Sequence, residues 1–533
     1  MGKNFSKYII VGAGSAGCAL AYNLSRDASR KVLLLEAGGK DLHPMIHVPL
    51  GFAVLMKEPK VNWCYNTEPE ANMNNRKLPW PRGKVLGGSS SINGMVYIRG
   101  QKTDYDAWAK AGNNGWSYDE VLPYFKKSEN FSEGANQHHG VGGPLWVETV
   151  KNKFEMAELF VQAGVEAGIP YNEDFNQGDN EGMGFYQLNI KNGLRQSSAK
   201  TFLKQCKNRT NLDIETRALT HKVLFDGKKA VGVSYSQKGK IINAYASQEV
   251  ILSSGAINSP QLLELSGIGC KERLESLGID VINNLPGVGE NLQDHLTINI
   301  QQGLKNVGTF YEETRPLAMI ANIAKFFVKR TGLLAHPAAQ SGAFFRCDEN
   351  SQTADAQIHF APAAGKYNDK GIMVTVPGTT ATVCYLNPTS RGNVHITTSE
   401  PATPPAIKAN YLDTENDQQK MIAALRKTRS IFQTKTIDNY RDAEVLPGSE
   451  VQSDEQILDY IRNHAESVYH PVGSCKMGND DMAVVDDQLR VRGVEGLRIA
   501  DCSIMPTILS GNTHAAAVMI AEKCADMVLS ANQ

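Results

Sequence analysis

The sequence predicts an α/β protein with two domains. One is expected to be built on a parallel sheet flanked by helices, and the other to be of the α+β type, on a mostly antiparallel sheet. A strand, glycine turn, helix and second strand follow one another near the N-terminus. Short alternating strands broken by Gly and Pro recur later in the chain. A length of 533 residues also exceeds the range in which a single hydrophobic core keeps growing.

The glycine turn near the N-terminus has the spacing of a Rossmann-like nucleotide-binding unit. Tyr8 to Val11 form a short apolar run typical of a buried parallel strand, and Gly12, Gly14 and Gly17 follow at once. The first glycine permits the tight turn, the second lets the backbone approach a pyrophosphate, and the third lets the helix lie close to the strand. Glu36 stands about 20 residues further on, where a carboxylate accepts hydrogen bonds from ribose. The motif predicts dinucleotide binding but does not separate FAD from NAD.

Composition excludes several other classes of function. With 55 basic and 56 acidic residues, the chain has no long-range field to attract nucleic acid. Its nine cysteines are scattered without a CxxC pair or metal-ligand spacing, so we expect reduced thiols and no metal site. We find no secretory signal pattern and no apolar run of the roughly 18 residues that span a bilayer. A cytoplasmic protein is expected, and peripheral contact with the inner face of the membrane stays open.

A second glycine-rich segment, PRGKVLGGSSSINGMVYIRG, covers residues 81–100. Gly87 and Gly88, followed by three serines, offer many backbone donors and little side-chain bulk. Such a segment suits close contact with a flat polar ring or a phosphate. Because apolar residues resume at Ile92, an ordered buried loop is favoured over a flexible linker.

These blocks resemble the signatures of the glucose-methanol-choline (GMC) oxidoreductases. Residues 81–100 resemble the first signature, and GAINSPQLLELSGIG at 255–269 resembles the second. Further matching blocks lie at 287–296, 469–478 and 498–522, in the family's order along nearly the whole chain. Within the family, the sequence is most similar to bacterial choline dehydrogenases and FAD-dependent dehydrogenases of aliphatic alcohols. The resemblance therefore implies a Rossmann-like FAD-binding domain of the GMC type.

The resemblance also implies which residues hold the cofactor. Family members that attach FAD covalently carry a histidine where this chain has Ile92, so non-covalent FAD is expected. The glycine turn and Glu36 are expected at the ADP half, Val223 at the adenine, and Asp501 at the pyrophosphate or ribityl side. The full set of expected cofactor-binding residues is Gly12, Gly14, Ser15, Ala16, Gly17, Glu36, Ala37, Arg82, Gly83, Val85, Gly87, Gly88, Ser89, Asn93, Gly94, Met95, Val96, Val223, Gly255, Ala500, Asp501, Asn512 and Thr513.

Two histidines near the C-terminus are the candidate proton carriers. By the resemblance, His470 lies on the first active-site position, in an HPxG motif, and His514 on the second, which is His or Asn in the family. Two imidazoles in one cleft lower each other's tendency to protonate, which keeps at least one of them a base. We expect His470 to be the general base and His514 to stabilise the substrate oxygen, and the opposite assignment stays open. Asn512 is a further candidate, for a hydrogen bond to flavin or substrate.

The expected reaction is oxidation of an alcohol CH–OH group to an aldehyde or ketone, with hydride transfer to flavin N5. The partners would be a small-molecule alcohol and an electron acceptor. A dehydrogenase that passes electrons to a quinone or another carrier is favoured. An oxidase using O2, or a redox-neutral family member such as a hydroxynitrile lyase or a fatty-acid photoenzyme, is the alternative. The particular alcohol and the oligomeric state are not predicted.

The motifs also predict how the chain is divided. The FAD domain is expected to combine residues 1–150, 196–300 and 466–533, and the substrate domain residues 151–195 and 301–465. Within the latter, strands are expected in 356–362, 371–386 and 392–398, and helices in 416–433 and 454–465. The other histidines, including His295 and His359, are expected to be structural.

Overall fold

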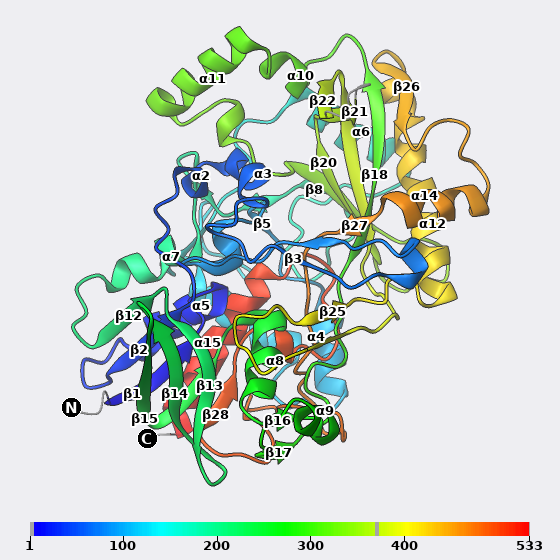
Figure 1. Cartoon of the computed structure of the whole chain (residues 1–533). Coiled ribbons are helices and arrows are strands. Elements are labelled where there is room, and N and C mark those ends of the chain that lie inside the picture. The colour runs from blue at the N-terminus through cyan, green and yellow to red at the C-terminus, as the bar shows by residue number, and fades with distance from the viewer. Residues whose placement is uncertain (1–4, 368–372, 532–533) are drawn as a thin grey trace.

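The computed structural model describes residues 5–367 and 373–531. Two seven-stranded sheets form its framework, and Figure 1 shows them in the lower and upper parts of the molecule. The first sheet has the order β12-β2-β1-β15-β14-β13, with β28 paired to β15. Its strands are β1 (Phe5–Val11), β2 (Val32–Glu36), β12 (Leu212–Thr216), β13 (Leu219–Asp226), β14 (Lys229–Gln237), β15 (Lys240–Leu252) and β28 (Leu497–Ile499).

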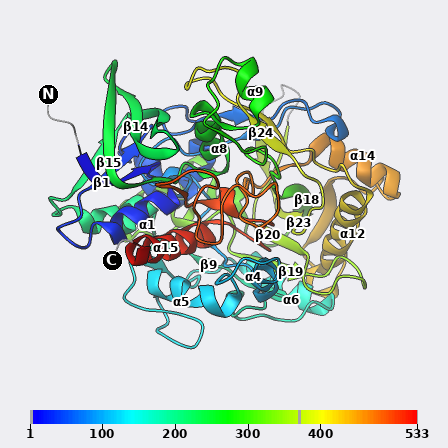
Figure 2. The same ribbon diagram turned by 90° about the horizontal axis from the view of Figure 1, so that it is seen from below.

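The N-terminal strand–turn–helix unit forms the centre of the first sheet. β1 runs parallel to both β2 and β15, and Tyr8, Ile9 and Ile10 are fully buried between them. Gly12 ends β1 with a φ of +96°, a conformation that favours glycine. Helix α1 (Ser15–Leu24) follows directly, and α15 (His514–Ala531) lies beside it (Figure 2). The Rossmann-like unit predicted from the glycine spacing is therefore present.

The second sheet has the order β26-β18-β23-β20-β19-β8, and β27 also pairs with β18. Every neighbouring pair in it is antiparallel, which confirms the expected second sheet. Helices α6 (Glu155–Glu166) and α12 (Glu415–Phe432) pack on it. Its strands are β8 (Gly182–Phe185), β18 (Leu296–Leu304), β19 (Ser341–Phe345), β20 (Ala356–Ala361), β23 (Gly378–Tyr385), β26 (Arg441–Leu446) and β27 (Glu466–Ser467).

Most local expectations for the later part of the chain hold. The strand expected in 356–362 is β20, and that in 392–398 contains β24 (Asn393–His395). The stretch 371–386 contains β22 (Met373–Val376) and β23, while 371–372 lie outside the described residues. The helices are α12 and α14 (Asp454–His464). The division into two domains stays a prediction, although β18 of the second sheet begins within the range assigned to the first domain. Among the described helices, none is both long and apolar enough to cross a membrane.

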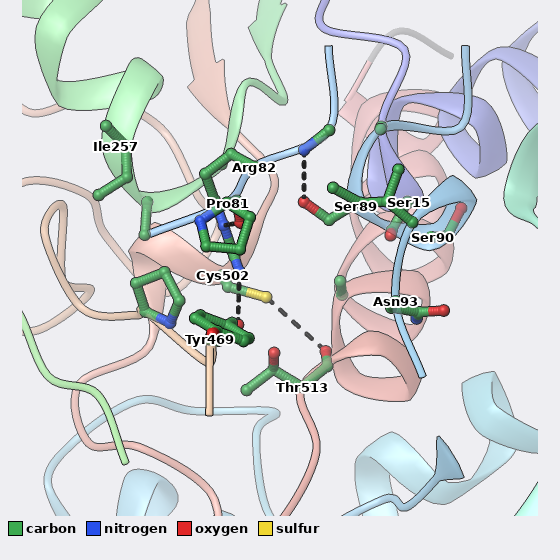
Figure 3. A pocket seen from close by; sticks show the side chains of 18 of the residues that line it. Ser15, Pro81, Arg82, Ser89, Ser90, Asn93, Ile257, Tyr469, Cys502 and Thr513 are labelled. Carbon is green, nitrogen blue, oxygen red and sulfur yellow. Dashed lines mark hydrogen bonds between the residues drawn. The ribbon is translucent and has the colours of Figure 1, made fainter. Parts of the chain in front are cut away.

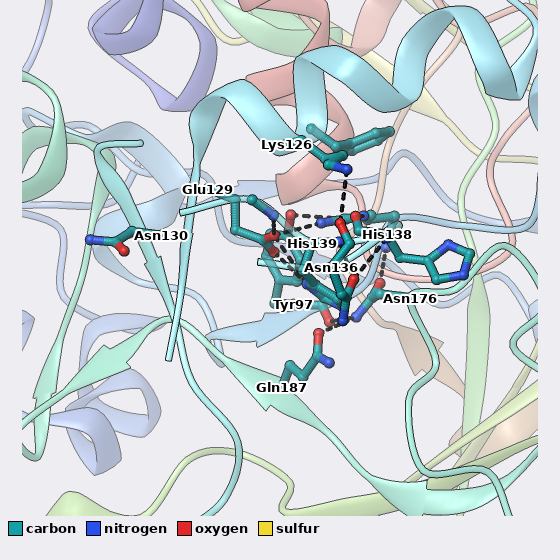
Figure 4. Close-up of polar contacts among 12 residues, drawn as sticks. Tyr97, Lys126, Glu129, Asn130, Asn136, His138, His139, Asn176 and Gln187 are labelled. Atoms are coloured by element: carbon teal, nitrogen blue, oxygen red, sulfur yellow. Dashed lines mark hydrogen bonds and ion pairs between the residues drawn. The ribbon is translucent and has the colours of Figure 1, made fainter. Parts of the chain in front are cut away.

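A cluster of buried and nearly buried charged side chains joins three segments of the chain, and Figure 4 shows Glu129 and His139 at its centre. Arg99 Nη2 lies 2.9 Å from Glu129 Oε2, and His139 Nδ1 lies 3.0 Å from the same oxygen. His139 Nε2 lies 2.8 Å from Asp174 Oδ2. Burial alone would lower the pKa of His139, but the hydrogen bonds to Asp174 and Glu129 outweigh it and the pKa is raised. When His139 is protonated, it and Arg99 thus balance the two carboxylates.

Replacing His139 by Gln is expected to destabilise the protein by about 2 kcal/mol, because charged hydrogen bonds to two buried carboxylates are lost. The pKa of His139 is higher in the folded protein than in the unfolded chain. Its contribution to the free energy of unfolding is therefore complete below about pH 6.5 and is lost as the pH rises through the pKa of the folded protein. Urea unfolding of the wild type and of His139→Gln across this pH range should therefore show a difference in the free energy of unfolding that shrinks towards alkaline pH. A difference that grows with pH would contradict the assignment, and His221→Gln is the matched control.

Candidate active site

One large cavity of about 520 Å³ lies between the two sheets. On one side it is lined by the residues that end β1 and β2, such as Gly12 and Glu36. On the other it is lined by side chains of the second sheet, among them Asn299 and His359. Figure 3 shows the part between these walls, where the serines of the second glycine-rich segment face Tyr469 and Thr513. A long molecule with two chemically different ends would fit between such walls.

The glycine turn is too crowded for any larger residue. A Cβ on Gly12 would lie 2.6 Å from the Ser253 carbonyl oxygen, and one on Gly17 only 1.8 Å from the Gly12 carbonyl oxygen. Gly14 and Ser15 line the cavity at the start of α1, which no side chain of the described residues caps. Its first N–H groups and its dipole are therefore free to bind a phosphate.

Glu36 is fixed at the end of β2 by backbone donors. Its Oε2 accepts a hydrogen bond from Ala13 N at 3.0 Å, and its Oε1 accepts one from Gly38 N at 2.7 Å. Burial raises its pKa to about 7, against the effect of these two bonds. The carboxylate keeps lone pairs for ribose hydroxyls, as the nucleotide motif predicts.

The second glycine-rich segment interlocks with the first. Gly88 has a φ of +52°, and a Cβ there would lie 2.7 Å from Gly14 Cα. Ser89 Oγ accepts a hydrogen bond from Gly83 N at 3.2 Å, and Arg82 Nη2 donates to the Tyr469 carbonyl at 2.6 Å (Figure 3). The two loops thus form one cradle, and the residues present fit the FAD that the resemblance implies.

The structure brings most of the expected cofactor residues to this cavity. Of the expected set, those that line it are Gly12, Gly14, Ser15, Ala16, Glu36, Ala37, Arg82, Gly83, Gly88, Ser89, Asn93, Gly94, Met95, Val96, Gly255, Asp501, Asn512 and Thr513. Behind this lining, Gly17, Gly87, Val85 and Ala500 support it. Gly87 N donates to the Ala13 carbonyl, and Ala500 N donates to the Leu252 carbonyl.

Val223 lies elsewhere than expected. Its N–H donates to Ser266 Oγ at 2.8 Å, in the body of strand β13, and its side chain is buried. The cavity is lined instead by Ala218, Leu219 and Thr220 at the start of that strand. The backbone contact with the adenine end that was expected of Val223 stays a prediction.

His470 is held on three sides. Its Nδ1 lies 3.1 Å from His295 Nδ1, and its Nε2 lies 3.1 Å from Asn512 Nδ2. Its backbone N–H donates to Asp294 Oδ1 at 2.7 Å. The preceding Tyr469 has a φ of +70°, a conformation rarely adopted by a bulky residue, which the surrounding contacts must maintain. The imidazole thus has a fixed orientation.

The hydrogen bonds also determine the tautomer of His470. His295 Nε2 lies 3.0 Å from the Leu386 carbonyl oxygen, which only accepts, so this nitrogen carries a proton. Burial lowers the pKa of His295 to about 4, so the ring is neutral and its Nδ1 is an acceptor. His470 Nδ1 must then donate to it. Burial, followed by the proximity of His295, holds the pKa of His470 well below 6.5. His470 is therefore neutral with an unprotonated Nε2.

Asn512 lies between two histidines. Its Oδ1 accepts from Gln357 Nε2 at 3.2 Å, which turns its amide nitrogen towards the rings. This nitrogen lies 3.1 Å from His470 Nε2 and 3.4 Å from His359 Nε2. Burial lowers the pKa of His359 to about 4 as well, so it is also a neutral acceptor. Two imidazoles and one amide thus converge on one point of the cavity wall.

His514 lines the same cavity as His470 but has a different hydrogen-bond partner. Its Nδ1 lies 3.0 Å from Ser15 Oγ, in the glycine turn, and its Nε2 is buried with no hydrogen-bond partner among the described residues. Burial lowers its pKa to about 4. His470 and His514 thus line one cavity, as expected, but the hydrogen bonds of the His470 ring go to His295 and Asn512 and that of the His514 ring goes to Ser15 in the nucleotide turn.

Sequence reasoning placed two residues of this site among the structural histidines. His359 lies on β20, where Ile358 and Phe360 point into the hydrophobic core. Because side chains alternate along a strand, His359 points to the opposite face, towards the cavity. This alternation could have identified His359 as a candidate site residue. His295 follows the NLQD run just before β18, but nothing in that run shows that it contacts a residue far along the chain.

The interlocked glycine loops, the carboxylate at the end of β2 and the converging imidazoles define a dinucleotide-binding enzyme with a proton-accepting site. Two models described as GMC oxidoreductase match residues 6–297 and 388–521. The chain therefore belongs to the GMC oxidoreductase family. It is 44% identical to an alcohol dehydrogenase (acceptor) of Pseudomonas putida over 528 residues, which cover 98% of this chain and 95% of that relative.

Two further comparisons agree. The chain is 45% identical over 528 residues to an oxygen-dependent choline dehydrogenase of Serratia proteamaculans, covering 98% of this chain and 95% of that relative. An FAD-dependent oxidoreductase from Chaetomium thermophilum has a structure that superposes with a TM-score of 0.91 at 29% identity, covering 99% of each chain. The expected α/β fold with its second, antiparallel sheet is thus shared along the full length of known family members.

Proposed function

We propose that this protein is an FAD-dependent dehydrogenase that oxidises an alcohol to an aldehyde or ketone. The observation that supports this most strongly is the neutral His470, whose unprotonated Nε2 lies in the cavity that carries the nucleotide loops. The names of the relatives, alcohol dehydrogenase and choline dehydrogenase, support the same reaction class.

The geometry suggests how the proton is removed. A substrate hydroxyl that enters between His470 and Asn512 would donate to His470 Nε2 and accept from Asn512 Nδ2. His470 Nε2 then takes the hydroxyl proton, and the cation that forms keeps its Nδ1–H on His295. The Asn512 amide stabilises the negative charge that develops on the substrate oxygen. Bound FAD supplies the acceptor for the hydride that leaves the adjacent carbon.

His514 is proposed to serve the cofactor instead of the substrate. Its buried Nε2 lacks a partner among the described residues, and its Nδ1 is held by Ser15 in the phosphate-binding turn. Replacing His514 by Ala should therefore weaken FAD binding by about tenfold, the cost of one hydrogen bond to a charged group. Titration of the apoprotein with FAD measures this directly. Unchanged affinity together with a large loss of flavin reduction would instead return His514 to the catalytic role expected from the sequence.

Anaerobic addition of alcohols to the yellow protein tests the function. Choline, aliphatic primary alcohols and an aromatic alcohol cover the candidate substrate classes, and a substrate will bleach the flavin absorbance. No bleaching across the panel would favour a redox-neutral lyase or photoenzyme. Dye reduction in excess of peroxide formation would support a quinone or similar carrier as acceptor, and the reverse result would identify an oxidase.

The finer features of the flavoprotein are part of the proposal. Ile92 lines the cavity where covalently attached members carry histidine, which supports non-covalent FAD. Acid precipitation should then leave the yellow colour in the supernatant, and colour in the pellet would contradict non-covalent binding.

The segments that contribute to the two sheets support a discontinuous FAD domain. All nine cysteines are free thiols, which supports a cytoplasmic protein, and activity confined to an oxidising compartment would contradict it.

A further inference from the structure

Helix α11 (Pro316–Lys329) presents an apolar face to solvent. Leu317 is 84% exposed, Phe327 68% and Val328 79%, and Ile320 is 65% exposed. At 3.6 residues per turn, these side chains share one face of the helix with two alanines. The only buried residues of α11, Asn322 and Phe326, lie on the opposite face. The polarity is the reverse of that of an ordinary surface helix.

The inner face alone attaches α11 to the protein. Asn322 Nδ2 donates to Glu313 Oε2 at 2.6 Å, and Asn322 Oδ1 accepts from Leu333 N at 3.3 Å. Figure 1 shows α11 standing clear of the sheets at one end of the molecule, joined through the short α10 (Phe310–Glu313). No described part of the chain covers the outer face, so its exposure costs free energy unless something outside the chain covers it.

Basic residues border this apolar face. Lys325 and Lys329 are exposed along its side, and Arg330 follows at the C-terminal end. Burial, and after it the nearby positive charges of Lys204 and Arg330, lowers the pKa of Lys200 to about 8. A cluster of like charges therefore lies at one end of the helix.

The acidic residues beside α11 are already engaged. Glu312 Oε2 accepts hydrogen bonds from the backbone N–H and hydroxyl of Thr309, and so caps α10. Glu313 accepts from Asn322, as described above. Asp41 lies near Lys200. Among the described residues, no carboxylate forms an ion pair with Lys325, Lys329 or Arg330, so these three cations can attract negative charge outside the protein.

We propose that α11 docks this protein onto a bilayer that contains anionic lipids. An amphipathic helix of this kind lies in the interface, with its apolar face among the acyl chains and its cations at the headgroups. Its fourteen residues span only about 21 Å, too short to cross a hydrocarbon core. A second copy of the chain would cover the apolar face, but because it presents the same surface it would bring no excess of negative charge to the cations that border that face.

Docking through α11 would also bring the cavity towards the membrane. The short turn η5 (Leu333–Ala335) packs against α11 on one side and against η1 (Pro49–Gly51) on the other. η1 leads into α3 (Phe52–Leu55), whose Phe52 lines the cavity and whose Val54 is 54% exposed. An apolar alcohol or electron acceptor dissolved in the bilayer would then reach the site from this side.

Cosedimentation of the FAD-bound protein with phosphatidylcholine vesicles, with and without phosphatidylglycerol, tests the proposal. We expect the wild-type protein to pellet with the phosphatidylglycerol vesicles. Combining Ile320→Gln, Phe327→Gln and Val328→Gln should weaken this binding more than tenfold, because their apolar area no longer enters the bilayer. Combining Lys325→Gln, Lys329→Gln and Arg330→Gln should weaken it by about 100-fold on anionic vesicles only.

The matched control is Ile241→Gln, which changes an equally exposed isoleucine on β15, 71% exposed, and should pellet like the wild type. Apart from Arg330, which is half-buried over the Phe326 ring, the substituted side chains are exposed, and all variants should keep the wild-type flavin spectrum. Wild-type protein that stays in the supernatant with both vesicle types would overturn the proposal. So would a self-association, seen by sedimentation velocity, that is lost in the apolar-face variant without any vesicle binding. Vesicle binding needs no turnover, so its failure is distinct from failure of the proposed alcohol oxidation.

Discussion

Replacing His470 by Ala is expected to lower the rate at which an alcohol reduces the bound flavin by about 1000-fold. In the structure, His470 Nε2 is the unprotonated nitrogen at the point where Asn512 and His359 converge. Without it, the hydroxyl proton has no acceptor of matched pKa in that position. Anaerobic rapid mixing, followed at the flavin absorbance, measures the reduction step separately from reoxidation.

The yellow colour should survive the substitution, because within the described residues the His470 ring forms hydrogen bonds to His295 and Asn512 and none to the two glycine loops of the cofactor cradle. His221→Ala, on β13 and away from the cavity lining, is the matched control and should reduce at the wild-type rate. A His470→Ala variant that retains FAD and reduces it at a rate close to the wild type would exclude His470 as the base.

The pH dependence of the wild-type reaction follows from the same geometry. Burial holds the pKa of His470 well below 6.5, so the base stays unprotonated through neutral pH. We therefore expect kcat/KM to be level from neutral pH upwards and to fall only in acid, where Nε2 becomes protonated. A rate that rises across the ordinary histidine range, near pH 6.5, would show that the base is a less buried group.

The glycine turn of the Rossmann-like unit could be predicted from the sequence, because the residues that it needs are set by neighbours close to it. Gly12 and Gly17 are required by contacts of 2.6 and 1.8 Å that a Cβ would make, and these depend on a few neighbouring residues. The antiparallel sheet was predictable for the same reason, since alternation is visible within each strand. Val223 shows the limit of this approach. The segment lies beside the cavity, but the residues that line the cavity are at the start of β13, and the position of a strand's start relative to a cavity depends on the whole sheet.

The active-site contacts were less predictable because they join distant segments. Asn512 and His514 are two residues apart at the point where α15 begins, and nothing local says which side chain turns to His470. The structure turns Asn512 to it because Gln357, on β20, holds the amide. His295 and His470 are 175 positions apart and meet only through the pairing of β18 with β27. The sequence motifs identified the C-terminal segments that carry the candidate active-site residues, but not which of these residues contact each other.

His295 is expected to be a positioning residue for His470, and its removal should have the second largest effect on the reaction. In His295→Leu, His470 Nδ1 loses its acceptor, so the proton is no longer confined to that nitrogen and Nε2 is unprotonated for less of the time. By analogy with partners that orient other functional imidazoles, we expect flavin reduction to slow by up to about 100-fold. The affinity for the alcohol should change little, because His295 does not line the cavity.

His295→Asn separates positioning from packing. Its side-chain oxygen lies close to where Nδ1 was, so it can still accept from His470 Nδ1, although it no longer reaches the Leu386 carbonyl. We therefore expect His295→Asn to recover most of the reduction rate that His295→Leu loses, even though both variants remove a buried ring and lower the unfolding temperature. If the two variants reduce flavin equally slowly, His295 only fills space. If both reduce it at the wild-type rate, the tautomer of His470 is fixed by other contacts, with Asn512 the remaining partner of its ring.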